Sequence, residues 1–352
     1  MTLFMRWPHP FRAPFVGLDV GTDAVKAVVL KKLRNGWSLV AATEVPMPDT
    51  GTSDPDATAE VLRQVFDTLR LRRARVATAL AGQSAIVKRL SLPAMSDAEL
   101  AEAIPWEAEQ YIPFDLADVQ LDFQVMNAGD ASRKTTDVLL VAAKRDKIDE
   151  RTDVVIRSGR QPVVLDLEAF ALVNAYEANH ADRNEPLTVL VHAGRTSTIV
   201  CLLERGQLAF TRDIALGGQS HSEALMRDLN VDALVAERLK FPTRPLLPGV
   251  TADQVRAVLR EVSSQLVSEI SKTIDFYRAT APIEKISRIV LSGGACAADS
   301  LSELLAAEFD APVEVFDPFR AIERRRGVEA GGVAGPAFAV AVGLAMREGG
   351  AA

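Results

Sequence analysis

The sequence predicts an α/β protein built from two similar lobes. The first observation is an internal repeat of a three-stranded unit, which occurs near the N-terminus and again in the middle of the chain. The second is that helical and β-rich segments follow each copy of the unit. The third is the length of 352 residues, which suggests about two domains. Together these observations predict two α/β lobes facing one another.

The first copy of the repeat lies close to the start of the chain. Residues 15–30 read FVGLDVGTDAVKAVVL, which are two β-rich runs separated by a Gly-Thr-Asp turn. A polar turn at 34–36 and a third strand at 37–45 complete a meander with tight, glycine-bearing turns. Helical periodicity at 57–72 and a β-rich run at 75–81 then predict the rest of a lobe.

The second copy has the same layout. Residues 187–203 read LTVLVHAGRTSTIVCLL, again with a glycine-centred turn between two β-rich runs. A turn at 204–206 and a strand at 208–214 follow, and apolar residues at helical spacing predict one long helix over 251–280. The later elements expected are a strand at 286–291 and a helix at 297–309.

Composition and charge exclude several classes of protein. Hydrophobic residues make up 48% and charged residues 25%, which is enough apolar material for a sizeable core. The formal charge of -7 argues against nucleic-acid binding, which needs a basic face. No window approaches the ~20 apolar residues of a membrane helix. The two cysteines favour a reducing cytoplasm, and the spacing of the four histidines gives no reason to expect a structural metal.

The two repeated turns are candidate phosphate-binding elements. Gly21 and Gly194 have no side chain, so the backbone amides there can approach a ligand closely. Thr22 and Thr196 add hydroxyl donors, and one turn from each lobe could clasp a polyphosphate. Taken singly, each turn is more often a plain β-turn, but the pairing of the two turns in matching positions favours phosphate binding. A third candidate, at 291–294, is a strand that runs into two glycines before a helix, which can also be only a capping turn.

Two further residues of the first copy are candidates for metal and phosphate. Asp19 is the natural residue to hold Mg²⁺ through water, because Mg²⁺ prefers oxygen ligands and keeps much of its hydration. Lys26 alternates with apolar neighbours and faces one side of its strand. A solvated strand lysine explains Lys26 equally well.

These motifs carry a family resemblance. The turns Asp19-Val20-Gly21-Thr22 and Ser292-Gly293-Gly294, with the turn at Gly194, resemble those of the actin, sugar-kinase and heat-shock-chaperone ATPase superfamily. The segment 236–240, AERLK, resembles the one that lines the nucleoside in the FtsA and PilM branches. The resemblance implies that ATP and Mg²⁺ bind. It assigns the phosphates to Asp19, Gly21, Thr22, Asp23, Lys26, His192, Gly194, Arg195 and Thr196, and the nucleoside to Gly217, Gly218, Glu237, Lys240, Gly293 and Gly294. Glu237 and Lys240 are equally a surface pair at i,i+3.

A separate stretch identifies the branch. Residues 104–114, IPWEAEQYIPF, followed by VQLDFQVM at 119–126, look like the signature of the type IV pilus assembly PilM family, and the tail AVAVGLAMR at 339–347 is similar to its closing helix. The resemblance runs from about residue 15 to 347. It implies an actin-like (ribonuclease H-like) fold with duplicated mixed sheets. The implied parts are a first lobe at 1–84 and 165–186, an inserted small subdomain at 85–164, a second lobe at 187–216 and 286–347, and a helical subdomain at 217–285.

The resemblance also implies a function. In that family the cleft beside the small subdomain takes the N-terminal cytoplasmic tail of the membrane protein PilN. This chain is then expected to be a cytoplasmic scaffold of the pilus inner-membrane complex, peripheral to the membrane through its partners and open to self-association. The groove residues it implies are Trp106, Glu109, Tyr111 and Phe114. A helix packed on a sheet would also explain Trp106 and Tyr111.

One residue departs from the family pattern. His192 stands two residues before Gly194, where the family usually has an acid, as Asp19 stands before Gly21. A neutral imidazole does not replace a carboxylate for Mg²⁺, and a protonated one would repel the metal but could contact a phosphate oxygen. We therefore expect ATP binding with absent or very slow hydrolysis. The alternative is that His192 only ends its strand and the nucleotide site is degenerate.

Two alternative functions are an FtsA-like filament-forming protein and a small-molecule kinase of the same superfamily. A filament-forming relative of FtsA would be expected to end in an amphipathic membrane helix, and the last residues, 348–352, read EGGAA. A sugar or small-molecule kinase would need a general base, for which Asp166 and Glu168 are the candidates. Both acids are equally a strand end and a carboxylate at a helix N-terminus.

Overall fold

The computed structural model describes most of the chain. The ranges are 13–48, 51–126, 134–180, 185–240, 246, 249–279, 285–297, 300–324 and 335–349. The chain forms two compact units, which we describe one at a time. Unit 1 contains residues 1–179, 319–333 and 340–352, and unit 2 contains residues 180–318 and 334–339.

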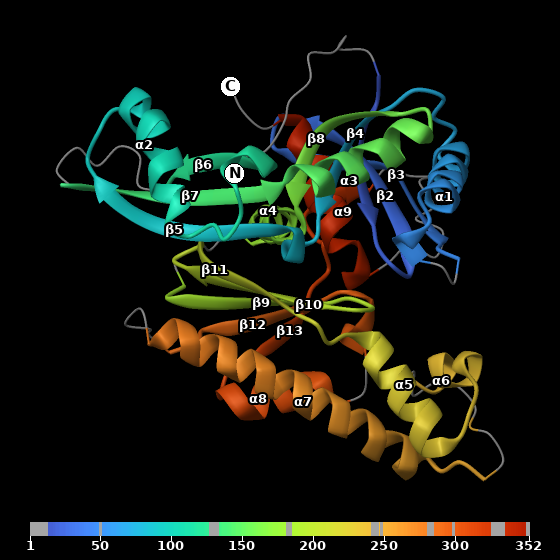
Figure 1. The fold of residues 1–352 in the computed structure, drawn as a ribbon. Helices are drawn as coiled ribbons and strands as arrows, with labels where there is room; N and C mark the ends of the chain where they lie inside the picture. The colour runs from blue at the N-terminus through green and yellow to red at the C-terminus, as the bar shows by residue number, and fades with distance from the viewer. Residues whose placement is uncertain are drawn as a thin grey trace. The chain divides into compact units, whose positions relative to one another are not determined.

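Unit 1 is built on a six-stranded mixed sheet with the order β14-β3-β2-β1-β4-β8 (Figure 1). β1, β2 and β3 form the antiparallel meander that the first repeat predicts, while β4 and β8 add to it in parallel. The strands are β1 (Phe15–Val20), β2 (Ala24–Leu33), β3 (Gly36–Pro46), β4 (Arg75–Leu80), β8 (Gln161–Leu167) and β14 (Ile322–Arg324).

Helices cover both faces of this sheet. Because side chains alternate along β1, Val16 and Leu18 lie in a buried cluster with residues of α1 and α3, whereas Phe15 lies in a cluster with residues of α4 and α9. The two clusters are the core of unit 1. The helices are α1 (Pro55–Thr68), α3 (Arg145–Arg157), α4 (Glu168–Asn179) and α9 (Ala339–Ala345).

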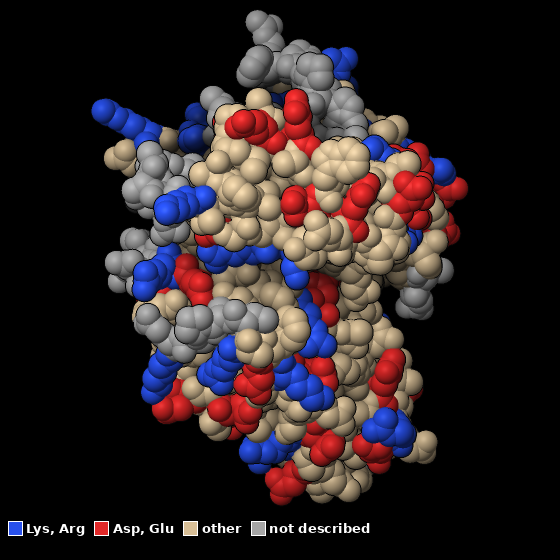
Figure 2. All heavy atoms as spheres, turned by 60° about the vertical axis from the view of Figure 1, so that its left-hand side comes forward, with Lys and Arg blue, Asp and Glu red and all other residues tan. Residues whose placement is uncertain are grey.

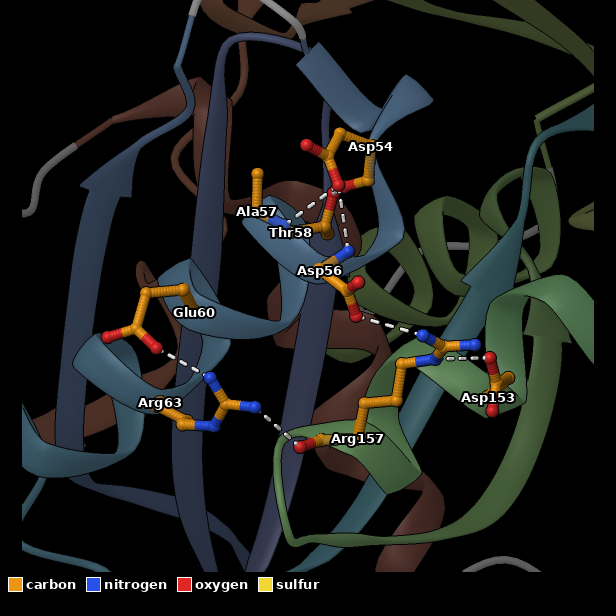
Figure 3. Close-up of polar contacts among 8 residues, drawn as sticks. All are labelled: Asp54, Asp56, Ala57, Thr58, Glu60, Arg63, Asp153 and Arg157. Carbon is orange, nitrogen blue, oxygen red and sulfur yellow. Dashed lines mark hydrogen bonds and ion pairs between the residues drawn. The ribbon is translucent and has the colours of Figure 1, made fainter.

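Polar contacts fasten α1 to α3 at the surface (Figure 3). The Asp54 carboxylate caps α1 by accepting hydrogen bonds from the amides of Asp56 and Ala57, at 2.9 and 3.1 Å. The Arg157 guanidinium at the end of α3 pairs with Asp56 of α1 at 2.8 Å. Because Val155 of α3 also lies in the main core of unit 1, α3 belongs to the six-stranded sheet. The small subdomain therefore ends near residue 144, before the expected boundary at 164.

The small subdomain is a three-stranded antiparallel sheet covered by one helix (Figure 1). Its strands have the order β5-β7-β6 and its helix is α2, with a Ser96–Glu99 capping box. Leu100, Ile104 and Ala108 of α2 are buried against the sheet. The elements are β5 (Ala85–Pro93), α2 (Asp97–Glu109), β6 (Val119–Val125) and β7 (Thr135–Lys144).

Unit 2 is built on a five-stranded sheet with the order β11-β10-β9-β12-β13. This order repeats β3-β2-β1-β4-β8 of unit 1, strand for strand and with the same directions of pairing. The internal repeat predicted from the sequence is thereby confirmed. The strands are β9 (Leu187–Ala193), β10 (Thr198–Glu204), β11 (Gln207–Ile214), β12 (Arg288–Ser292) and β13 (Val313–Val315).

The helices of unit 2 follow the predicted order, with one shifted start. The long helix α7 (Ala252–Arg278) matches the segment predicted at 251–280. α8 (Leu301–Phe309) begins four residues later than expected, because a 3-10 turn at Gly294–Ala297 and a positive φ of 73° at Ser300 precede it. The remaining helices are α5 (Gly218–Leu229) and α6 (Ala233–Leu239).

The C-terminal segment lies in unit 1, whereas the sequence assigned 286–347 to the second lobe. β14 pairs in parallel with β3, and α9 approaches β1 so closely that a Cβ on Gly17 would lie 2.3 Å from the Ala341 carbonyl oxygen. Arg347 then pairs with Asp166 at the end of β8, with the Arg347 Nε 2.6 Å from a carboxylate oxygen. The pairing of β14 with β3 and the buried ion pair of Arg347 thus hold the C-terminal segment in unit 1, although the partners are far apart in sequence.

The described helices contain no segment long and apolar enough to cross a membrane. Cys201 and Cys296 are both buried as free thiols. Within the described residues, no three metal-ligating side chains gather as a metal centre would require.

Candidate functional site

The turn between β1 and β2 is the phosphate candidate of unit 1. Asp19 is buried at the end of β1 and faces Lys26 across the antiparallel pair. A Cβ on Gly21 would lie 3.0 Å from the Ala24 carbonyl oxygen, so a side chain there would crowd the turn. The Met47 amide donates to the Asp23 carbonyl at 2.8 Å, which ties the turn to the end of β3. The turn is thus short, glycine-dependent and anchored.

The electrostatics of Asp19 involve a residue that the sequence did not single out. Burial raises the pKa of Asp19, and the positive charges of Lys26 and Arg151 act in the opposite direction. Arg151 comes from α3 and donates to the Val20 carbonyl at 3.3 Å. No motif marks Arg151, because only the packing of α3 on the sheet brings it to the turn. Lys26 also pairs with Glu44 at 3.8 Å, so it is not a freely solvated strand lysine.

The corresponding turn of unit 2 packs directly on the start of α5. The Gly194 amide donates to Ser197 at 2.9 Å and closes the turn. The first backbone amides of α5 also donate hydrogen bonds to this turn. The Gly218 amide donates to the Gly194 carbonyl at 2.9 Å, and the Gln219 amide donates to the Arg195 carbonyl at 2.7 Å. A Cβ on Gly217 would lie 2.6 Å from the carbonyl oxygens of Gly194 and Arg195. Glycine at 217 is therefore required by this close approach.

The third turn joins the second at the carboxyl ends of β9 and β12. Gly293 has a φ of 92°, and a Cβ there would lie 2.1 Å from the Ala193 carbonyl oxygen. The Ser292 hydroxyl and the His192 Nδ1 are 3.0 Å apart and form a buried hydrogen bond. The candidate residues at 192–194, 217–218 and 292–293 thus come together within unit 2. Arg195 and Thr196 are exposed at the tip of the turn.

Glu237 and Lys240 of the α6 segment are part of the same cluster. They form an ion pair at 2.6 Å, as their i,i+3 spacing allows. They are more than a surface pair, because the Lys240 ammonium also donates to the Gly218 carbonyl at 3.2 Å and the Ser222 hydroxyl donates to Glu237 at 2.6 Å. Burial alone would raise the pKa of Glu237, but hydrogen bonds from Lys240 and Ser222 and the charges of Lys240 and Arg195 outweigh it and lower the pKa.

The residues expected to line the partner groove belong to the small subdomain. Trp106 is 73% exposed, and Tyr111 and Phe114 are each 41% exposed, so none of the three is a core residue. The interpretation of Trp106 and Tyr111 as core packing is wrong, since Leu100, Ile104 and Ala108 form the buried face of α2. Lys88 lies over the Tyr111 ring at 5.2 Å, and Lys144 lies over the Phe114 ring at 3.9 Å. Glu109 is exposed at the end of α2.

Asp166 has no access to a substrate hydroxyl. It is fully buried, accepts from the Leu167 amide at 2.9 Å and pairs with Arg347. Burial raises the pKa of Asp166, against the charge of Arg347. This carboxylate is a structural group, which removes one of the two general bases that a kinase function would need.

Comparison with known proteins gives one family and a consistent fold. A model of the family described as type IV pilus assembly protein PilM matches residues 17–349. The chain is similar to a solved structure titled "PilM-PilN type IV pilus biogenesis complex", at 28% identity over 96% of this chain and 98% of that one, with a TM-score of 0.82. Lower similarity extends to the ethanolamine utilization protein EutJ of Carboxydothermus hydrogenoformans, at 16% identity over 97% and 92% of the two chains and a TM-score of 0.56. MreB 5 of Spiroplasma citri bound to AMPPNP gives 15% identity over 96% and 97%, with a TM-score of 0.53. These likenesses are to actin-like proteins, so the predicted fold class is confirmed.

Proposed function

Because the chain belongs to the type IV pilus assembly protein PilM family, we propose that it is an actin-like scaffold of the type IV pilus inner-membrane assembly complex. The observation that carries the proposal is the match of 96% of the chain, at a TM-score of 0.82, to a solved structure titled as a PilM-PilN complex. The protein acts in the cytoplasm and is held at the inner membrane by its partner. No specific observation favours a kinase or an FtsA-like filament.

The partner is the N-terminal cytoplasmic tail of a PilN-like membrane protein. The small subdomain supports this because it exposes three aromatic side chains, Trp106, Tyr111 and Phe114, close together in sequence. Exposed aromatic side chains are typical anchors of protein interfaces, since they bury much apolar area at little entropic cost.

The proposed nucleotide is ATP, held together with Mg²⁺, and the MreB 5 structure, which has a similar fold, is bound to the ATP analogue AMPPNP. In unit 1 the groups assigned to phosphate and metal are the glycine turn, the Asp19 carboxylate and Lys26. In unit 2 a side chain at Gly194, Gly217 or Gly293 would collide with backbone carbonyls of the protein itself, so these glycines let their three segments pack together at the carboxyl ends of β9 and β12, where the nucleotide is proposed to bind. Asp19 supplies oxygen, so Mg²⁺ would complete its shell with water and phosphate oxygens.

Hydrolysis is absent or very slow. The group at the second turn is His192, whose Nδ1 is already hydrogen-bonded to Ser292. A nitrogen ligand held in this way offers Mg²⁺ and an attacking water no carboxylate oxygen. The nucleotide would then stabilise a conformation rather than supply energy by turnover.

Calorimetric titration tests the proposal. The full chain is titrated with ATP and Mg²⁺, and separately with a synthetic peptide of the N-terminal tail of the PilN-like protein from the same source. We expect binding of both ligands with little phosphate release. Absence of peptide binding would overturn the scaffold assignment. Peptide binding without ATP binding would leave a pure adaptor with a degenerate nucleotide site.

A further inference from the structure

The outward face of α2 combines an exposed indole with acidic side chains. Glu102, Trp106 and Glu109 are spaced four and three residues apart, so they lie in one stripe along the helix. The buried residues Ile104 and Ala108 lie on the opposite side. All three members of the stripe are exposed, and Trp106 at 73% is as exposed as any large apolar side chain that the structure describes. We call Glu102, Trp106 and Glu109 the α2 stripe.

The chain segment that contains the stripe carries charges of one sign. Residues 94–118 contain seven Asp and Glu residues and no Lys, Arg or His, which gives a formal charge of −7, equal to that of the whole chain. The acids are Asp97, Glu99, Glu102, Glu107, Glu109, Asp115 and Asp118. Figure 2 shows exposed Asp and Glu side chains set among uncharged surface on this side of unit 1. The net charge of the protein is thus concentrated on one small element.

The two aromatic rings that follow the stripe in sequence, Tyr111 and Phe114, already make cation–π contacts with lysines of the same subdomain. Lys88 covers the ring of Tyr111 and Lys144 covers that of Phe114. Among the described residues, no lysine or arginine lies over the ring of Trp106. An indole is the aromatic ring that binds cations best, and carboxylates on both sides strengthen the attraction. The stripe therefore has the chemistry of a receptor for a Lys or Arg side chain.

We propose that the α2 stripe docks the basic, membrane-proximal part of the partner's tail, with a Lys or Arg of the tail on the Trp106 indole between Glu102 and Glu109. This inference rests on the proposed function and adds the chemistry of the partner. Cytoplasmic segments close to a membrane-spanning helix carry an excess of Lys and Arg, so the tail of an inner-membrane protein is basic where it nears the bilayer. The acidic stripe is complementary to such a segment.

The same charge disfavours the lipid surface as the occupant. The cytoplasmic leaflet is negative and attracts basic segments, whereas the small subdomain at 85–144 has ten acidic and five basic residues and is repelled by it overall. A bound tail would neutralise the stripe and let this subdomain lie near the bilayer. Complementary charge also raises the association rate and makes binding dependent on salt.

Binding of two tail peptides tests the inference. One peptide has the natural sequence of the PilN-like tail, and the other has each Lys and Arg replaced by Gln. We expect the natural tail to bind the full-length protein more tightly than the neutral one, with the difference lost at high salt. Trp106→Ala should weaken binding of the natural tail about tenfold, as loss of an aromatic anchor and a cation–π contact does. Trp106→Phe should retain part of the affinity.

The acids are tested in the same titrations. The double variant Glu102→Gln/Glu109→Gln should bind the natural tail severalfold more weakly than the unaltered protein does. Its affinity for the neutral tail should be unchanged. Leu234→Ala in unit 2 is the control for Trp106, because Leu234 is also 73% exposed. Asp118→Asn is the control for charge, because Asp118 is an exposed acid of the same subdomain outside α2. Both controls should bind the natural tail as the unaltered protein does.

The outcomes separate the inference from the proposed function. If neither peptide binds the unaltered protein, the scaffold assignment fails and the inference fails with it. If both peptides bind equally, or if the Trp106 and Glu102/Glu109 variants bind the natural tail normally, the tail docks elsewhere and only the inference is overturned. Vesicles of anionic lipid serve as a third probe, and their capture by the unaltered protein would contradict the expectation that the lipid surface is disfavoured.

Discussion

His192 sets the chemistry that the second turn can offer in the proposed nucleotide site. It occupies the position of Asp19 in the other copy of the repeat, but it is a buried nitrogen ligand bonded to Ser292. The substitution is visible in the sequence, because the two turns can be aligned by their glycines. Its consequence depends on the bond to Ser292, which no sequence pattern announces.

Replacing His192 with Asp is expected to switch on hydrolysis. A carboxylate supplies the oxygen ligand that Mg²⁺ prefers, so the rate of Mg²⁺-dependent phosphate release should rise about tenfold or more. This corresponds to an activation free energy lower by on the order of 1 kcal/mol. Steady-state phosphate release measures it, and Ser292→Ala is the control that removes the bond without adding a carboxylate. Fast hydrolysis by the unaltered protein that disappears in Asp19→Ala would contradict the expectation.

His221 gives unit 2 a dependence on pH. Its ring is buried between α5 and α7, with Nε2 3.1 Å from the Ser263 hydroxyl, and burial lowers its pKa below the ordinary value of 6.5 for histidine. The unfolded chain therefore binds a proton more readily than the folded one, so stability is fully present above about pH 6.5 and falls as the pH drops toward the folded pKa. We expect denaturant unfolding to lose on the order of 1 kcal/mol between about pH 7.5 and pH 5.5.

The variant His221→Gln isolates that contribution. It keeps a polar side chain of similar reach toward Ser263 but has no titration in this range. Its unfolding free energy should therefore change less between the two pH values than that of the unaltered protein. An identical change in both proteins would show that other groups cause the pH dependence.

Some residues of the site were beyond sequence reasoning. The glycine turns, Asp19 and the pair Glu237–Lys240 could be found from motifs, because spacing and residue type carry the information. Arg151 could not, since it reaches the first turn only through the packing of α3. Trp106 was ambiguous, because a tryptophan in an apolar stretch fits a core and an interface equally. The helical phase of Leu100, Ile104 and Ala108 would have resolved it.

At the scale of elements, boundaries set by long-range packing were the least predictable. The strands and helices of both repeats follow from local periodicity. The assignment of α3 and α9 to the six-stranded sheet of unit 1 does not follow from local periodicity, because contacts with residues far away in sequence position each helix. α9 illustrates this well. It is a short helix of small residues that fits unit 1 only because glycines allow its backbone to touch its neighbours.

Gly343→Ala is expected to weaken unit 1 severely. A Cβ at this position would lie 1.8 Å from the Ala171 carbonyl oxygen of α4, so backbone must move to admit it. We expect a loss of at least about 2 kcal/mol of unfolding free energy, measured by denaturant titration. Gly294→Ala is the matched control, because a Cβ there has nothing within 4 Å. Equal stability of Gly343→Ala and the unaltered protein would mean that α9 shifts freely.

At the scale of the whole molecule, the repeat was the most informative feature. Five strands of each sheet follow one order, and this order was implied once the two meanders had been recognised. The sixth strand, β14, was not foreseen, because three residues with two charges carry no strand pattern. Sequence thus predicts the duplicated cores well, while the segments that return to them are determined by the folded structure alone.

Binding of nucleotide should be visible in the stability of the whole protein. A ligand that binds only the folded state adds about 2.7 kcal/mol of stability at a hundredfold excess over its dissociation constant. We therefore expect ATP with Mg²⁺ to raise the Tm in differential scanning calorimetry, and adenosine, which lacks the phosphates, to raise it less. The same Tm with and without ATP would mean that the glycine turns hold no nucleotide.

The ion pair between Asp166 and Arg347 has a consequence for biosynthesis. The two residues are separated by 181 positions, so a ribosome finishes Asp166 long before it adds Arg347. At ordinary rates of synthesis the interval is roughly 10–35 s. During this time the first-made unit lacks α9 and holds a carboxylate without its guanidinium, while β9 to β13 are still being synthesised. Unit 1 is thus completed only by the last part of the chain, and the nascent protein presents a surface that a chaperone can recognise until the final helix arrives.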